Sequence, residues 1–481
     1  MAFPVGLEGI HDYERNLREI CDYALSHGIK SRKSINPLTC SKEDYNKFIA
    51  KCHEGFDLAQ DMIVNQFLEI QGEKRNYGVE LKDARRKKDK TTAYLCEANI
   101  VYLTNRELIL RKVADAIAWQ MWGLQRWNLR RLYLGKQMPY LDSANIDSII
   151  SATKEINKEP LSFGLIADIT SFIQIGDILA VDRSKESAEI HLIEMKAGEM
   201  NLKVMEFLES FDKIQCPRIP YFFAQEHGKA ALEQALRVTK QQMKAAQVMQ
   251  IVKTGKGKDP YFDRDIVIPD EIFEEDDYDE TLARLIEKCR INGAACDVVD
   301  DCLFLGVYDP SKYPRYLSDF TNYLYFNLTG IKRDPFMYSE EFYENELFLF
   351  LEKAYPIYDL RLSLTIPLSK PLFLRLLPKE DIFNIIFGKV IILLYLDYER
   401  LFERAKDKGI VGKWSTEEAR KEHGVKDFYS KLGKRPMFEK EGKVNMMGDG
   451  SLSRIIDGTK PDSVLELVEH SLSRINWDKT P

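Results

Sequence analysis

Three ionisable residues lie at or beside the ends of two apolar runs: Asp177, Glu194 and Lys196. Unpaired charge is costly to bury, so two acids and a lysine at such positions suggest a site. If a short turn at 184–187 joins the runs as antiparallel strands, Asp177 lies opposite Glu194. Side chains alternate along a strand, so Glu194 and Lys196 share a face.

Two carboxylates opposite each other repel unless a cation lies between them. Mg²⁺ suits this place, because one or two carboxylates hold it while water and phosphate oxygens complete its octahedron, and Mn²⁺ accepts the same ligands. With Lys196 beside it, such an ion supports phosphodiester hydrolysis. The residues alone leave a second interpretation open, a surface hairpin in which Lys196 pairs with either acid. The triplet acid-x-Lys by itself favours that simpler interpretation.

The order Asp177, turn, Glu194-Met195-Lys196 resembles the PD-(D/E)XK nuclease superfamily, with Gly176 in place of the proline. The resemblance implies a restriction-endonuclease-like mixed β-sheet flanked by helices, in which Asp177 and Glu194 bind Mg²⁺ or Mn²⁺ and Lys196 helps to activate water. It further implies a nuclease acting on DNA, with RNA also possible, in a bacterial branch linked to restriction or phage defence. It covers roughly residues 100–255.

Three features extend the resemblance. "IADITSFIQIGDIL" is similar to a D-x-T, then G-D arrangement, which offers Asp168 as a secondary acid. "KQQMK" resembles a helix signature that directs Gln241 to the catalytic site and Lys240 or Lys244 to phosphate, although arginine is more usual at the last position. Many members also carry a metal-binding carboxylate on the helix before the sheet, where this chain has Glu107.

Glu107 has a second explanation from the residues themselves. Thr104 and Glu107 match the capping-box spacing, which predicts a helix over 103–122. Ser41 and Asp44 similarly predict the start of a long helix over 41–72. A polar loop or exposed helix end is expected at 75–92, strands within 161–197, a helix over 228–253 and a strand over 297–309.

These patterns indicate an α/β or α+β chain of several parts. We expect a helical N-terminal region (1–95), a nuclease-like domain (96–260), an acidic linker (261–285) and a C-terminal α/β domain (286–481) of unknown role. Composition agrees with a globular protein, since 44% of the 481 residues are hydrophobic and 30% are charged.

Partners and location are predicted from composition and local charge. Arg126, Arg130 and Arg131 stand beside Trp127 and Tyr133, which suits contact with phosphates and bases. The longest apolar run, "VIILLYL", is too short for a membrane helix, and the cysteines form no CxxC pair. We therefore expect a soluble, cytoplasmic protein that binds DNA rather than a membrane, alone, as a homodimer or with a partner protein.

Two alternatives to an active nuclease remain at this point. The first is a catalytically inactive module that keeps the nuclease fold for nucleic-acid or protein binding. The second is a structural or interaction protein in which the hairpin is accidental. Divalent-ion binding that depends on Asp177 distinguishes the active nuclease from the first alternative, while Asp177 and Glu194 carboxylates more than about 8 Å apart would favour the second.

Overall fold

The computed structural model describes residues 10–31, 40–135, 141, 146–185, 188–195, 219–261, 264–268, 275–329, 357–422, 435–447 and 449–474. The described chain is mixed α+β, and it divides into two compact units, residues 1–271 and 272–481. The predicted boundary at 95/96 falls inside a continuous helix. The described helices include none long and apolar enough to cross a membrane.

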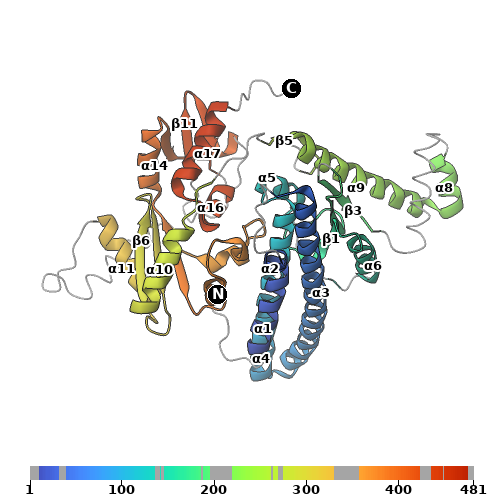
Figure 1. Ribbon diagram of the computed structural model, residues 1–481, viewed down its shortest axis with the longest axis horizontal. Coiled ribbons are helices and arrows are strands. Elements are labelled where there is room, and N and C mark those ends of the chain that lie inside the picture. The colour runs from blue at the N-terminus through green and yellow to red at the C-terminus, as the bar shows by residue number, and fades with distance from the viewer. Residues whose placement is uncertain are drawn as a thin grey trace. The chain divides into compact units, whose positions relative to one another are not determined.

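Two long helices, α3 (Lys42–Lys87) and α4 (Lys90–Met121), form an antiparallel hairpin in the first unit (Figure 1). The Ser41 hydroxyl caps α3 by accepting the N–H of Asp44 at 3.1 Å, as the sequence predicts. Asp89 caps α4 in the same way. Between them, Lys88 takes a left-handed conformation that closes the short connection.

The two helices correct two predictions. The long helix predicted over 41–72 continues to Lys87, so the segment 75–92 contains the exposed end of α3, one of the two possibilities expected for it. Thr104 does not begin a helix, because α4 starts thirteen residues before Leu103, at Lys90, and the Thr104 hydroxyl donates to the Ile100 carbonyl at 2.7 Å. The capping-box explanation of Glu107 is therefore wrong.

A three-stranded antiparallel sheet packs with these helices, in the order β1 (Ser162–Ile166), β2 (Ile178–Asp182), β3 (Glu189–Ile193). Parts of α3 and α4 are exposed to solvent. A side chain on α3 reaches β1, and side chains on α4 reach the loop after it. All strand pairings in the described ranges are antiparallel, whereas the resemblance implied a mixed sheet.

The edge of β1 is completed by side-chain amides rather than by another described strand. Gln60 on α3 donates to the Gly164 carbonyl at 3.2 Å and accepts the Ile166 N–H at 2.8 Å. Asn157, the last residue of α6 (Ile146–Asn157), accepts the Gly164 N–H at 2.7 Å. These bonds satisfy backbone groups that an open sheet edge would leave exposed.

The rest of the first unit consists of short helices near the N-terminus and a helix with a hairpin after the sheet. α9 (Lys229–Thr254) agrees with the prediction over 228–253 to within one residue at each end. The remaining elements are α1 (Ile10–Cys21), η1 (Asp22–Ser26), α2 (His27–Ser31), α5 (Arg126–Leu129), η2 (Arg130–Leu132), η3 (Ala167–Ile169), α8 (Ile219–His227), β4 (Lys256–Asp259) and β5 (Arg264–Val267).

The second unit has two antiparallel sheets, ordered β6-β7-β9-β8 and β10-β11-β12. The strand predicted over 297–309 is instead a hairpin, β6 (Ala294–Val299) and β7 (Leu303–Tyr308), turned by Asp300 and Asp301, which both have positive φ. The predicted linker is wrong in its second half, because buried Tyr278 and α10 (Asp279–Asn292) belong to this unit.

The other elements of the second unit follow in chain order. They are α11 (Tyr316–Thr329), β8 (Tyr358–Asp359), η4 (Leu360–Leu364), η5 (Leu372–Leu374), α13 (Lys379–Ile386), β9 (Ile391–Leu396), α14 (Tyr398–Asp407), β10 (Val411–Trp414), α15 (Glu417–Glu422), β11 (Pro436–Lys440), β12 (Lys443–Met446), α16 (Asp449–Ile456) and α17 (Pro461–Arg474).

Candidate active site

The register of the β2–β3 hairpin agrees with the sequence prediction. The strands pair from Asp182↔Glu189 to Ile178↔Ile193, so the next pair in this series is Asp177 with Glu194. The ladder distorts at that point, because the Asp177 N–H donates to the Ile193 carbonyl at 2.8 Å. The Asp177 carboxylate accepts the backbone N–H of Met195, the middle residue of the Glu-x-Lys triplet.

Gly176 explains how the chain enters this distorted position. Its φ of 75° lies in the left-handed region, which proline cannot adopt. A Cβ built on it would also lie 3.2 Å from the Ile193 carbonyl oxygen. This position therefore has glycine, and not the proline of the PD-(D/E)XK motif, because the backbone requires a positive φ here.

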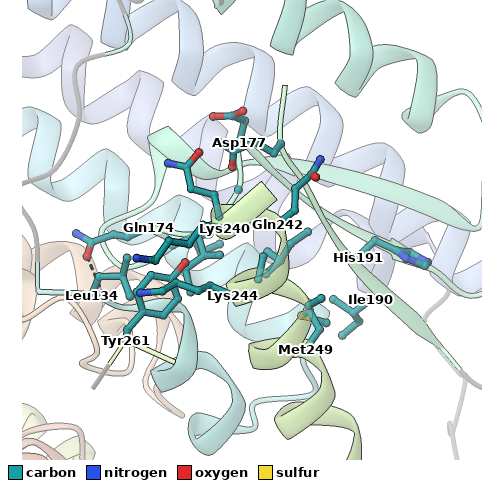
Figure 2. A pocket seen from close by; sticks show the side chains of 18 of the residues that line it. Leu134, Gln174, Asp177, Ile190, His191, Lys240, Gln242, Lys244, Met249 and Tyr261 are labelled. Atoms are coloured by element: carbon teal, nitrogen blue, oxygen red, sulfur yellow. Dashed lines mark hydrogen bonds between the residues drawn. The ribbon is translucent and has the colours of Figure 1, made fainter. Parts of the chain in front are cut away.

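Three acidic residues line one cavity of about 720 Å³: Asp168 in η3, Asp177 before β2 and Glu194 after β3. α9 contributes Lys240, Gln241 and Lys244 to the same cavity. Figure 2 shows Lys240 and Lys244 extending to the same side of α9. The structure therefore brings together six residues that the sequence selected. Lys196, which the sequence also selected, lies outside the described residues.

The acids influence one another electrostatically. Burial, together with the negative charges of Asp177 and Glu194, raises the pKa of Asp168 to about 6, against the opposing effect of the Arg111 guanidinium. This concentration of negative charge suits a cation. In the described ranges, however, no group of three or more His, Cys, Asp or Glu residues is arranged to hold a metal ion. Asp177 and Glu194, at the end of the β2–β3 hairpin, are therefore the two carboxylates left to bind a cation.

Glu107 is not among the residues lining the cavity, which corrects its predicted role as a metal ligand. Its carboxylate accepts hydrogen bonds from the Lys74 ammonium at 2.9 Å and the Arg111 guanidinium at 2.8 Å. Burial alone would raise its pKa, but these two cations outweigh burial and lower it. Glu107 therefore stays ionised and orients Arg111.

Arg111 connects α4 to the acidic turn. The side chain is 1% exposed, and one terminal nitrogen donates to the Asp168 carbonyl at 2.6 Å and the Thr170 carbonyl at 2.9 Å. Glu107 supplies the opposite charge, because it lies four residues, or about one helical turn, before Arg111. The guanidinium thereby holds the backbone on either side of Ile169 and fixes the position of Asp168.

A second buried pair on α4 holds the next residue of the loop. Lys112 and Asp115 form an ion pair of 3.0 Å, and Asp115 accepts both the N–H of Ser171, at 2.7 Å, and its hydroxyl. Sequence reasoning missed Arg111, Lys112 and Asp115. The signal was present, since "RELILRKVADAIAW" places charges at helical spacing within an apolar helix, where each requires a partner.

The side chains on α9 have distinct environments. Lys240 and Gln241 are exposed, while Lys244 is partly buried with its ammonium 4.7 Å from the centre of the Tyr261 ring. His191 also lines the cavity, and Figure 2 shows its ring extending away from the Lys240 and Lys244 ammonium groups. The end of the site nearest α9 is therefore cationic.

The three predicted nucleic-acid-binding arginines do not share one environment. Arg130 is exposed, and the Arg126 guanidinium packs 5.5 Å from the centre of the Trp119 ring. The Arg131 side chain is 12% exposed and forms a 3.1 Å ion pair with Asp259, itself 2% exposed. Arg131 therefore joins η2 to β4 as a structural residue, which corrects its predicted role as a nucleic-acid contact.

Comparisons with known proteins add no relative. No protein-family model, curated protein or solved structure matches the chain.

Proposed function

We propose that the protein is a metal-dependent nuclease that hydrolyses DNA phosphodiester bonds. The observation that carries the proposal is the cavity that contains Asp168, Asp177 and Glu194 together with Lys240, Gln241 and Lys244. Acids that hold a divalent cation and cations that hold phosphate are the two charge requirements of phosphodiester hydrolysis. We also propose that the sheet and helices around this cavity form a restriction-endonuclease-like core.

Each residue has a distinct role in this mechanism. Asp177 and Glu194 hold Mg²⁺ or Mn²⁺, and Asp168 adds negative charge beside them. A divalent ion held by these acids would polarise the phosphate and lower the pKa of water. Lys196 positions the attacking water and Gln241 supports it. The Lys240 and Lys244 ammonium groups hold the phosphate on the side of α9.

A catalytically inactive module is the second candidate, and two observations favour it. One is the lack of a three-residue metal cluster within the described ranges. The other is the Met195 N–H, which already occupies one carboxylate oxygen of Asp177. Such a module would bind nucleic acid or protein through the same cavity without cleaving a phosphodiester bond.

A cleavage assay tests the proposal. The purified chain is incubated with linear, circular and single-stranded DNA in Mg²⁺ or Mn²⁺, in parallel with Lys196→Ala and an EDTA control. We expect cleavage by the wild type alone and only with metal. Cleavage that survives Lys196→Ala would remove the proposed mechanism, and DNA binding without cleavage would support the inactive module.

A further inference from the structure

The connection between α3 and α4 carries a concentrated positive charge. Residues 82–94, here named the hairpin tip, begin with "KDARRKKDK", which has six lysines and arginines against two aspartates. The whole chain has a formal charge of −7. The tip is therefore strongly positive on an acidic protein.

Ion pairs and helix electrostatics explain only part of this charge. Arg85 pairs with Glu97, and Arg86 and Lys87 pair with Asp83. These three cations also lie in the last turn of α3, where the helix dipole favours positive charge.

The other three cations have no such explanation. No hydrogen bond or ion pair within the described chain is formed by the side chains of Lys82, Lys88 or Lys90, and all three are exposed. Lys90 is the first residue of α4, where the helix dipole disfavours a cation. Positive charge at that end is intramolecularly unfavourable, which points to a partner outside the chain.

An aromatic ring accompanies these lysines. Tyr94 lies one helical turn after Lys90, so the two side chains share a face of α4. Tyr94 is 71% exposed. Ammonium groups and tyrosine hydroxyls are both donors that commonly contact the phosphates of a nucleic-acid backbone.

We propose that the hairpin tip binds the sugar–phosphate backbone of duplex DNA. Asp89 precedes Arg111 by 22 residues on the same helix, and Arg111 bonds to the Asp168 carbonyl. At 1.5 Å per helical residue, the tip lies about 33 Å along α4 from Arg111, whose side chain reaches the turn that carries Asp168. A duplex rising about 3.4 Å per base pair covers that length in about ten base pairs. The spacing argument rests on the proposed function, while binding at the tip does not.

A binding measurement tests the inference without cleavage. A fluorescent duplex of about 30 base pairs is titrated with protein in EDTA at several salt concentrations, and anisotropy is read. The variant is Lys82→Gln/Lys88→Gln/Lys90→Gln. Its matched control is Lys47→Gln/Lys154→Gln/Lys158→Gln, an equal charge change at exposed lysines that already pair with acids.

We expect the tip variant to lower the slope of log affinity against log salt by about 2 to 3, because each lost phosphate contact removes about 0.9. Its affinity at about 0.1 M salt should fall at least about tenfold, with the control within about twofold of wild type. Thermal melting of both variants checks their folding.

Three outcomes would overturn the inference. The first is a wild type that does not bind the duplex, and the second is an equal salt slope for wild type and tip variant. The third is lysine-dependent binding to phosphatidylserine vesicles with unchanged DNA binding, which would assign the tip to a membrane surface. EDTA prevents metal-dependent cleavage, so the titration measures binding alone. It therefore tests the inference even if the protein is catalytically inactive.

Discussion

The guanidinium of Arg111 donates a 2.6 Å hydrogen bond to the backbone carbonyl of Asp168. A buried helix residue thereby fixes the turn that carries one acid of the candidate site, while Glu107 keeps the guanidinium in place. The position of Asp168 depends on α4 as much as on the sheet from which its turn extends.

Replacing Arg111 should therefore destabilise the first unit. Arg111→Met leaves Glu107 with one fewer cation and two carbonyls without their donor, so we expect a loss of about 3–5 kcal/mol in the free energy of unfolding. Urea denaturation measures it. Arg85→Met is the control, because its ion pair with Glu97 is exposed and should contribute less than about 1 kcal/mol. Equal effects of the two substitutions would refute the structural role.

Asp168 should destabilise the metal-free protein at alkaline pH. Its pKa of about 6 exceeds the ordinary 3.8, so the folded state disfavours the carboxylate, and the stability contributed by the protonated form is lost as pH rises through 6. Asp168→Asn should then raise the free energy of unfolding by about 1–3 kcal/mol near pH 8. Thermal melting in EDTA should show this gain shrinking near pH 4. A gain independent of pH would contradict the electrostatic cause.

Gln60 offers a test of the sheet edge. Its buried amide makes two hydrogen bonds to β1, and Gln60→Leu would leave the Gly164 carbonyl and Ile166 N–H without them. We expect a loss of about 2–4 kcal/mol, because two buried backbone groups lose their partners. Amide hydrogen exchange at Ile166 should accelerate, and unchanged protection there would show that Gln60 does not complete the edge.

Substitutions of the adjacent residues Arg130 and Arg131 should differ in their effects on stability. Arg131→Ala breaks a buried ion pair with Asp259 and should lower the free energy of unfolding by about 3–5 kcal/mol. Arg130→Ala changes an exposed side chain and should leave stability within about 0.5 kcal/mol. Of the two substitutions, only Arg130→Ala should lower the affinity for duplex DNA when both variants are compared as folded proteins. Equal stability of both variants would show that the Asp259 pair is not structural.

Much of the site was predictable because strand register and alternation are local properties. A four-residue turn was enough to predict the pairing up to Ile178↔Ile193, and helical spacing was enough to predict α9. The bend at Gly176, where the ladder departs from that register, depends on a positive φ that the letters do not specify.

Other features could not be read locally. The charged end of α3 has no apolar period, yet packing against α4 keeps it helical to Lys87. Thr104 and Glu107 fit a capping box, but the tertiary structure places them inside a longer helix. The Asp168 carbonyl that Arg111 binds and the Asp259 carboxylate that Arg131 binds lie 57 and 128 residues away, beyond any local pattern.

Divalent-ion binding tests the central claim most directly. Calorimetric titration of Mn²⁺ into the wild type should reveal a site that Asp177→Asn and Glu194→Gln each weaken by about tenfold or more, because each removes one carboxylate ligand. Glu97→Gln, which changes an exposed carboxylate that does not line the cavity, should retain the site. A wild type that binds no Mn²⁺, or a Glu194→Gln variant that binds as tightly as wild type, would contradict the proposal.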